Sequence, residues 1–134
     1  MAEKMHFELV SPERLLMDGE VDAVVVPGSE GDFMVLPRHA PMMTTIRPGV
    51  VHVSADEGDA RRLFIRGGFA EVTPKGLIIL AEEAVDLADL SKSDLESRLG
   101  DAKEDLEDAK TDQAQQVAAE AVKQLSQLIK ALGS

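Results

Sequence analysis

The chain has 134 residues, of which 44% are apolar, so it is long enough for one ordinary domain or two small units with a modest core. The absence of cysteine excludes a disulfide scaffold, a thiol nucleophile and a cysteine-ligated zinc or iron–sulfur site. A formal net charge of −11 and an aromatic content of 3% argue against electrostatic binding of nucleic acid or anionic lipid and favour protein partners.

Neither a secretory leader nor a membrane span is expected. The N-terminal segment MAEKMHFELV lacks the long apolar core of a signal peptide. Elsewhere no apolar run approaches the roughly 18 residues that cross a bilayer. We therefore expect a soluble chain that does not insert into lipid.

The first part of the chain predicts a β-hairpin. Residues 5–10 alternate apolar and polar side chains, as a half-buried strand does, and Ser11-Pro12 ends the strand. Residues 15–17 then lead to an expected Asp18-Gly19 turn. The AVVV run within residues 21–26 predicts a strand buried on both faces.

Residues 26–49, VPGSEGDFMVLPRHAPMMTTIRPG, hold four of the six prolines and three glycines, so short extended runs must alternate with fixed bends. Strands are predicted at residues 33–36 and 42–46. The turns between them carry four charged or titratable side chains toward solvent: Glu30, Asp32, Arg38 and His39. A rigid edge that carries charged side chains in this way is typical of a docking surface.

Further strands follow at a regular spacing. They are predicted at residues 50–54, 61–66, 69–72 and 77–81, with a polar connection at 55–59 and a Pro74-Lys75-Gly76 turn. Turns every eight to twelve residues favour a β-sandwich or a barrel.

Near Glu82 the apolar period changes from that of a strand to that of a helix. Ser91 and Asp94 resemble a capping box that starts a helix, and Gly100 inside it should cost about 1 kcal/mol relative to alanine. One apolar stripe follows this helix: Leu95, Leu99, Ala102, Leu106 and Ala109. A second helix after residues 110–112, with a C-cap at Gly133, has the stripe Ala114, Ala118, Ala121, Leu125, Leu128 and Leu132.

These two helices should form an antiparallel hairpin with facing stripes. The expected domains are therefore 1–85, an all-β docking domain, and 86–134, an α-helical hairpin. Alanine-rich stripes bury little area, so we expect the hairpin to be the mobile half. Residues 86–112 carry ten acidic and four basic side chains, net −6, whereas residues 113–134 have one acidic and two basic side chains, net +1.

No arrangement of residues indicates catalysis, a metal or another cofactor. The three histidines, His6, His39 and His52, are not spaced as HxH or HExxH. There is no GxSxG elbow and no GxxxxGK[ST] phosphate loop, and the glycines are better explained by turns. His39 could be either a contact residue or a hydrogen-bonded anchor of its bend.

The segments PGSEGDF, LPRHAP and IRPG, in this order, resemble the epsilon subunit of bacterial F-type ATP synthases. The surrounding chain agrees with this resemblance, because it contains Val10-Ser11-Pro12, RGGFAEV at 66–72, IILA at 78–81 and a two-helix tail. The resemblance covers nearly the whole chain. It implies a β-sandwich of about ten strands followed by a helical hairpin.

The resemblance also implies a role and partners. Proteins of this family belong to the rotating central stalk, where the sandwich binds the gamma subunit and rests on the polar loops of the membrane c-ring. The subunit would have no catalytic residue and would lie peripherally at the cytoplasmic face of the bacterial inner membrane. Carried over by position, Glu30, Gly31 and Asp32 would face the c-ring, and His39 would lie near the same c-ring-facing end of the sandwich. The gamma subunit would contact Val26, Phe33, Arg38 and Pro41.

The hairpin departs from relatives that bind ATP. Those relatives carry an Asp and an Arg-Ala pair at the start of the first helix, and aligning Asp89-Leu90 with them puts Ser91, Asp94 and Leu95 there. An aspartate would replace the phosphate-binding arginine, so we expect no appreciable ATP binding. In some relatives the hairpin reaches the alpha/beta head and blocks ATP hydrolysis through basic residues. Here the acidic and neutral helices predict only weak attraction.

Two other interpretations stay open from the sequence. A free-standing β-sandwich adaptor could use the hairpin to bind a partner helix. A small jelly-roll enzyme is disfavoured by the missing metal pattern.

Overall fold

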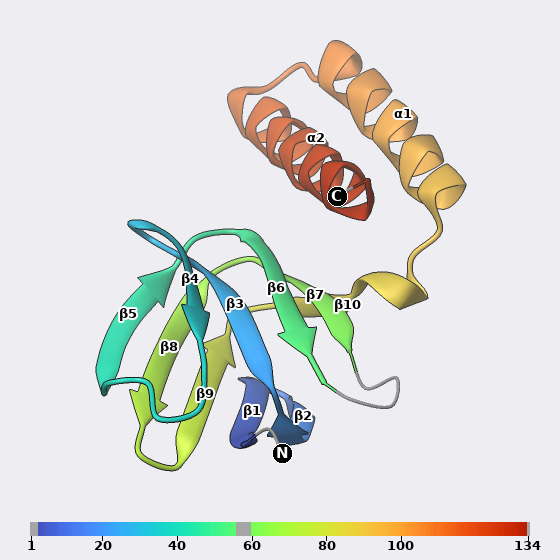
Figure 1. The fold of residues 1–134 in the computed structure, drawn as a ribbon. Coiled ribbons are helices and arrows are strands. Elements are labelled where there is room, and N and C mark those ends of the chain that lie inside the picture. The colour runs from blue at the N-terminus through green and yellow to red at the C-terminus, as the bar shows by residue number, and fades with distance from the viewer. Residues whose placement is uncertain (1–2, 56–59, 134) are drawn as a thin grey trace. The chain divides into compact units, whose positions relative to one another are not determined.

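A computed structural model of the chain describes residues 3–55 and 60–133 (Figure 1). Contacts between Cα atoms divide it into two compact units, Met1–Ala88 and Asp89–Ser134. The predicted polar connection at 55–59 lies, apart from Ala55, outside the described residues.

The described part of the first unit contains ten strands. Their bounds are β1 Met5–Ser11, β2 Arg14–Val21, β3 Ala23–Gly28, β4 Gly31–Val35, β5 Met42–Ile46, β6 Gly49–Ser54, β7 Arg61–Ile65, β8 Gly68–Thr73, β9 Gly76–Ala81 and β10 Ala84–Asp86. The strands predicted from alternation after residue 26 are confirmed to within about two residues at each end. The three-residue β10, which pairs with β7, was missed because so short a run carries no measurable period.

The ten strands form one hydrogen-bonded sheet that folds over itself into a β-sandwich. The strand order is β10-β7-β6-β3-β5-β8-β9-β1-β2, and β4 pairs separately with β3. The link between β3 and β5 consists of the single pair Gly28 and Ile46, so the sheet bends sharply there. One layer therefore contains β10, β7, β6, β3 and β4, and the other contains β5, β8, β9, β1 and β2. The predicted sandwich is confirmed.

The core lies between the two layers because each strand directs alternate side chains inward. In β1, Phe7 and Leu9 have no exposed surface, whereas His6 and Glu8 are half-buried on the outer face. Residues from both layers meet in one apolar cluster, which includes Val24 and Val26 from β3 and Leu77 and Ile79 from β9. This cluster fixes which face of each strand can meet a partner.

The predicted Asp18-Gly19 turn is wrong. Both residues lie inside β2, where Asp18 pairs with Glu8 and Gly19 with Phe7. The chain instead reverses between Ser11 and Arg14, where the Ser11 hydroxyl donates to the Arg14 carbonyl at 3.3 Å. The seven paired positions of β1 and β2 override the local turn preference of Asp-Gly.

Strand β3 was expected to be buried on both faces from residue 21. It begins at Ala23, after a one-residue corner at Asp22, and only one face is fully buried. Val24 and Val26 have no exposed surface, whereas Val25 is half-buried on the other face. A run of valines fits either case, so its length could not distinguish one buried face from two.

The second unit is a helical hairpin, as expected. Figure 1 shows α1, Lys92–Asp108, and α2, Asp112–Leu132, side by side and antiparallel, after a short 3-10 turn at Leu87–Asp89. The Ser91 side chain accepts a hydrogen bond from the Asp94 amide at 3.4 Å, which confirms the predicted N-cap. Neither helix is long and apolar enough to cross a membrane.

The buried line on α2 differs from the predicted stripe at both ends. Ala114, in the first helical turn, is exposed, and Ala131 is buried whereas Leu132, which the predicted stripe includes, is half-buried. Ala118 and Leu128 are buried as predicted.

Gly100 offers a direct test of helix propensity in this unit. It is exposed within α1, and a Cβ atom added there would meet nothing within 4 Å. Gly100→Ala should therefore stabilise the hairpin by about 1 kcal/mol, because alanine loses less backbone conformational entropy than glycine when the helix forms. Thermal unfolding followed by circular dichroism at 222 nm checks this.

The matched control is Gly133→Ala. Gly133 lies at the C-cap of α2 with a negative φ of −82°, so helix-interior propensity does not apply and little change is expected. An unchanged or lowered melting temperature for Gly100→Ala would contradict the expectation.

Candidate functional site

The acidic turn between β3 and β4 is exposed and braced from a neighbouring strand. Glu30, Gly31 and Asp32 are all exposed, and Gly31 has a φ of +131°, which favours glycine. Arg47, just after β5, places Nη2 2.6 Å from Asp32 Oδ1 and donates from Nη1 to the Gly28 carbonyl at 3.2 Å. The turn is therefore a fixed acidic projection, and the brace from Arg47 was not foreseen.

Behind this turn the backbone and Phe33 are closely packed. A Cβ atom at Gly28 would lie 2.9 Å from both the Phe33 ring and the Gly31 carbonyl. The half-buried Phe33 ring thus packs against the backbone at Gly28, next to the turn. Val26, one of the predicted gamma contacts, has no exposed surface, so its side chain can act only from within the core.

The bend at residues 36–41 has its own internal bonds. The His39 amide donates to the Leu36 carbonyl at 3.0 Å, and His39 Nδ1 lies 2.7 Å from the Ala40 carbonyl. Arg38, with a left-handed φ of 70°, pairs with Glu3 at 2.6 Å. Of the two roles left open for His39, these bonds favour the structural anchor of the bend.

His39 and the acidic turn do not come together. Glu30 precedes β4, Gly31 and Asp32 begin it, and His39 follows the other end of this five-residue strand, which spans about 16 Å. Figure 1 shows the loop into β5 and the β3–β4 turn at the two ends of this strand. Strand β4 therefore lies between His39 and the acidic turn, and the placement of His39 near the c-ring stays a prediction.

A row of apolar side chains crosses the outer face of the second layer. Strand register places four of them in line, since Phe69 pairs with Leu80, Leu80 with Val10, and Val10 with Leu15. Phe69 is 51% exposed, and Leu80 and Leu15 are each 54% exposed. We call Phe69, Leu80, Val10 and Leu15 the apolar row.

Three members of the apolar row, Phe69, Leu80 and Val10, line a depression of about 710 Å³ with a charged edge. Arg66 lines it and bonds through Nε to Glu83 at 2.6 Å. Its Nη1 is buried and finds no hydrogen-bond partner among the described residues. Because exposed apolar patches with polar rims mark protein contacts, this surface is suited to docking a protein.

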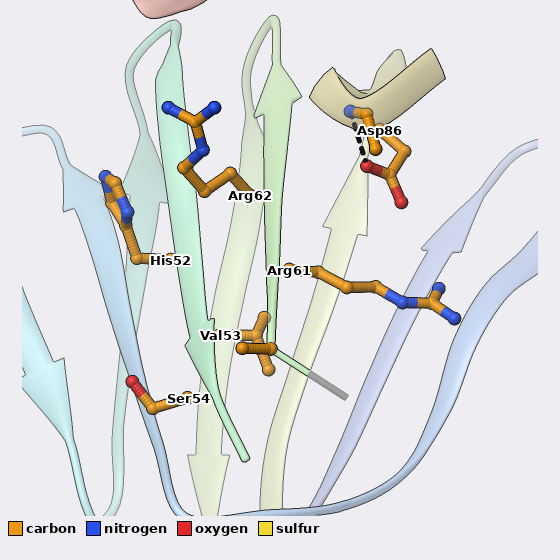
Figure 2. Close-up of a pocket in the computed structure, with 8 residues that line it drawn as sticks. His52, Val53, Ser54, Arg61, Arg62 and Asp86 are labelled. Atoms are coloured by element: carbon orange, nitrogen blue, oxygen red, sulfur yellow. Dashed lines mark hydrogen bonds between the residues drawn. The ribbon is translucent and has the colours of Figure 1, made fainter. Parts of the chain in front are cut away.

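A second hollow, of about 550 Å³, lies beside β6 and β7 and is lined by His52, Arg61, Arg62 and Asp86, among others (Figure 2). The two guanidinium groups point apart in Figure 2, because neighbouring strand residues face opposite ways. The Asp86 carboxylate is occupied, since it accepts from the Ala88 amide at 2.9 Å. These side chains do not converge on one point, so the hollow offers no acid–base pair for catalysis.

Comparison with known proteins gives one consistent result. Residues 4–87 match the family described as ATP synthase, Delta/Epsilon chain, beta-sandwich domain. The chain is 52% identical over 128 residues to the ATP synthase epsilon chain of Parvibaculum lavamentivorans, covering 96% of this chain and 97% of that one. It is 57% identical over 119 residues to the epsilon chain of Maricaulis maris, covering 89% of each.

Solved structures share the fold. The chain resembles a chain of the Euglena gracilis mitochondrial ATP synthase with a TM-score of 0.77 and 24% identity, covering 96% of this chain and 81% of that one. It also resembles a chain in the central stalk and c-ring structure of the Tetrahymena thermophila mitochondrial ATP synthase, with a TM-score of 0.65, 16% identity and coverage of 97% of each. At this identity the likeness supports the fold alone.

Proposed function

The chain belongs to the ATP synthase epsilon chain family, and from this premise we propose that it is a non-catalytic central-stalk subunit that links the gamma subunit to the c-ring. In this role it couples proton translocation to ATP synthesis from a peripheral position at the cytoplasmic face of the bacterial inner membrane. The observation that supports this most is the apolar row, which is an exposed docking surface on a rigid sheet.

The gamma subunit is the proposed occupant of the apolar row. Phe69 and Leu80 supply apolar area at its centre, and the ion pair of Arg66 with Glu83 lies at its edge. Arg38 and Pro41, both exposed at the bend before β5, extend the contact. Phe33 contributes through its half-buried ring.

The acidic turn is the proposed c-ring contact. Glu30, Gly31 and Asp32 project from one end of the sandwich, and the bonds from Arg47 hold them in place. A braced turn transmits force between rotor parts better than a flexible loop would. His39 is left out of this contact because β4 separates it from the turn.

Asp32→Lys is expected to uncouple the enzyme without loss of the gamma subunit. The Asp32–Arg47 pair is exposed and is worth only about 0.2–1 kcal/mol, so the fold should survive, whereas a cation replaces an anion at the c-ring. ATP-driven proton pumping by reconstituted membranes should fall relative to ATP hydrolysis. Gamma binding, measured by co-purification, should be unchanged.

The matched control is His39→Ala, at the other end of β4. It should keep its proton pumping coupled, because the bend does not meet the c-ring in this proposal. Equal uncoupling by both variants, or full coupling in Asp32→Lys, would contradict the assignment of the turn.

The helical hairpin is proposed to be a weak regulator at most. Toward the alpha/beta head it offers an acidic α1 and a nearly neutral α2, so charge attraction to an acidic partner surface is small. We also propose that it does not bind ATP. Asp94, at the position where ATP-binding relatives have arginine, pairs with Arg98 at 3.2 Å and offers a negative charge to phosphate.

Removal of residues 89–134 tests the regulatory role. The cut follows Ala88 because β10 and the buried Leu87 belong to the sandwich, which residues 1–85 alone would leave incomplete. Gamma binding and coupling should persist, and ATP hydrolysis by the assembled enzyme should change little. Several-fold activation would instead reveal an inhibitory hairpin.

A further inference from the structure

Four metal-ligating side chains gather on the outer face of the β1–β2 ribbon. Register pairs His6 with Glu20 and Glu8 with Asp18, so the patterns His-x-Glu and Asp-x-Glu face each other. His6 Nε2 lies 3.0 Å from Glu8 Oε1 and 2.9 Å from Asp18 Oδ1. The His6, Glu8 and Asp18 side chains remain 40%, 36% and 46% exposed, so solvent and ions reach them.

Charge on this face is unbalanced without a cation. Two carboxylates directly opposite each other destabilise a strand pair, and Glu8 and Asp18 stand in this relation with Glu20 beside them. On the other side of β1, strand β9 brings Gly76 and Ile78 to the positions that pair with His6 and Glu8, and neither carries charge. His6 is thus the cationic group that contacts Glu8 and Asp18, while Lys4, two residues before it, pairs with Asp22 at 3.4 Å.

The carboxylates around the His6 imidazole change its pKa. The hydrogen bond with Glu8 raises the pKa of His6 above 6.5. Burial, the second-largest effect, lowers this pKa, and the charges of Asp18, Glu8 and Glu20 raise it. A metal ion that binds Nε2 has to displace the proton held there.

We propose that His6, Glu8 and Asp18 form a binding site for a divalent transition-metal ion of the zinc class. Their three ligand atoms lie within 4.8 Å of one another. Ligand atoms that each lie about 2.1 Å from one tetrahedral ion are about 3.4 Å apart, and both separations from His6 Nε2 are somewhat shorter than this. The two carboxylates therefore have to move away from Nε2 by a few tenths of an ångström when an ion binds between the three groups.

The ligand set selects the type of ion. An imidazole nitrogen with two carboxylates suits zinc, whereas magnesium and calcium prefer oxygen ligands alone. Three protein ligands leave further positions to water, so the ion exchanges freely and binds less tightly than in a closed structural site. Since its ligands come from β1 and β2, the bound ion ties together the two strands at one edge of the sheet.

Calorimetric titration of the full chain with zinc chloride at pH 7.5 tests the proposal, with magnesium chloride as the comparison ion. One zinc ion per chain is expected to bind, and magnesium is not. His6→Ala and the nearly isosteric Asp18→Asn should each weaken zinc binding by about tenfold or more. The control His52→Ala, which removes a half-buried histidine from β6, should bind like the unmodified chain.

Proton NMR of the unmodified chain gives a second readout that does not depend on how the variants fold. Zinc should shift the ring signals of His6 and leave those of His39 and His52 in place, and it should raise the melting temperature. Absence of saturable zinc binding, equal binding by His6→Ala, or ring shifts at His39 or His52 alone would overturn the site.

Discussion

Replacing Gly68 with alanine is expected to destabilise the β-sandwich by about 3 kcal/mol or more. Gly68 has a φ of +142°, and a Cβ atom there would lie 2.0 Å from the Leu80 carbonyl oxygen and 3.0 Å from Ala81 Cα. Both obstacles are backbone, so no side chain can rotate to make room. Because Gly68 pairs with Ile46 on one side and Ala81 on the other, three strands must separate locally.

Urea unfolding followed by circular dichroism measures this effect, since the chain has no Trp or Tyr for fluorescence. Gly31→Ala is the matched control. Gly31 has a similar φ of +131°, but its added Cβ would meet nothing within 4 Å. It should therefore show only the conformational strain, on the order of 1 kcal/mol. Equal losses for the two variants would mean that close backbone approach at Gly68 is not the cause.

The double variant Phe69→Glu with Leu80→Glu should weaken binding of the gamma subunit by at least about 100-fold. Phe69 and Leu80 pair at the centre of the apolar row, and each is about half exposed, so the fold does not depend on burying them. Two carboxylates would remove apolar contact and would have to lose their hydration inside the interface. Titration calorimetry with purified gamma subunit gives the affinity.

The matched control changes two exposed apolar residues outside the apolar row. Met34, which is 54% exposed in β4, and Val117, which is 66% exposed in α2, can be replaced by glutamate with the same change in charge. This control should bind gamma almost normally. If the control loses affinity to the same extent, the added negative charge is responsible and not the loss of the apolar row. Normal binding by the variant with glutamate at Phe69 and Leu80 would place the gamma subunit on another surface.

Local patterns in the sequence were sufficient for most of the fold. Alternation marked β1 because its inward and outward side chains differ in polarity, and the Ser91 cap marked the start of α1. The Asp18-Gly19 turn failed because a turn preference is worth less than the continuous pairing of β2 with β1. Which layer a strand joins depends on partners far away in sequence, so periodicity alone could not supply the sheet order.

The acidic turn was predictable from its glycines and carboxylates, but its brace was not. Arg47 lies 15 residues after Asp32 and reaches it only because β5 crosses beside β3. The apolar row was missed for a similar reason. Phe69, Leu80, Val10 and Leu15 come from four strands, and the row depends on the parallel pairing of β1 with β9. One signal was available, since Phe69 and Leu80 are large apolar residues in the outward phase of their strands.

The most direct test of the central-stalk role is sedimentation of an equimolar mixture of this chain and its gamma subunit, with each protein shown to be folded beforehand. The expected result is a single one-to-one complex for the unmodified chain and for the chain ending at Ala88. Two separately sedimenting proteins under these conditions would contradict the assignment of gamma as the partner of the sandwich.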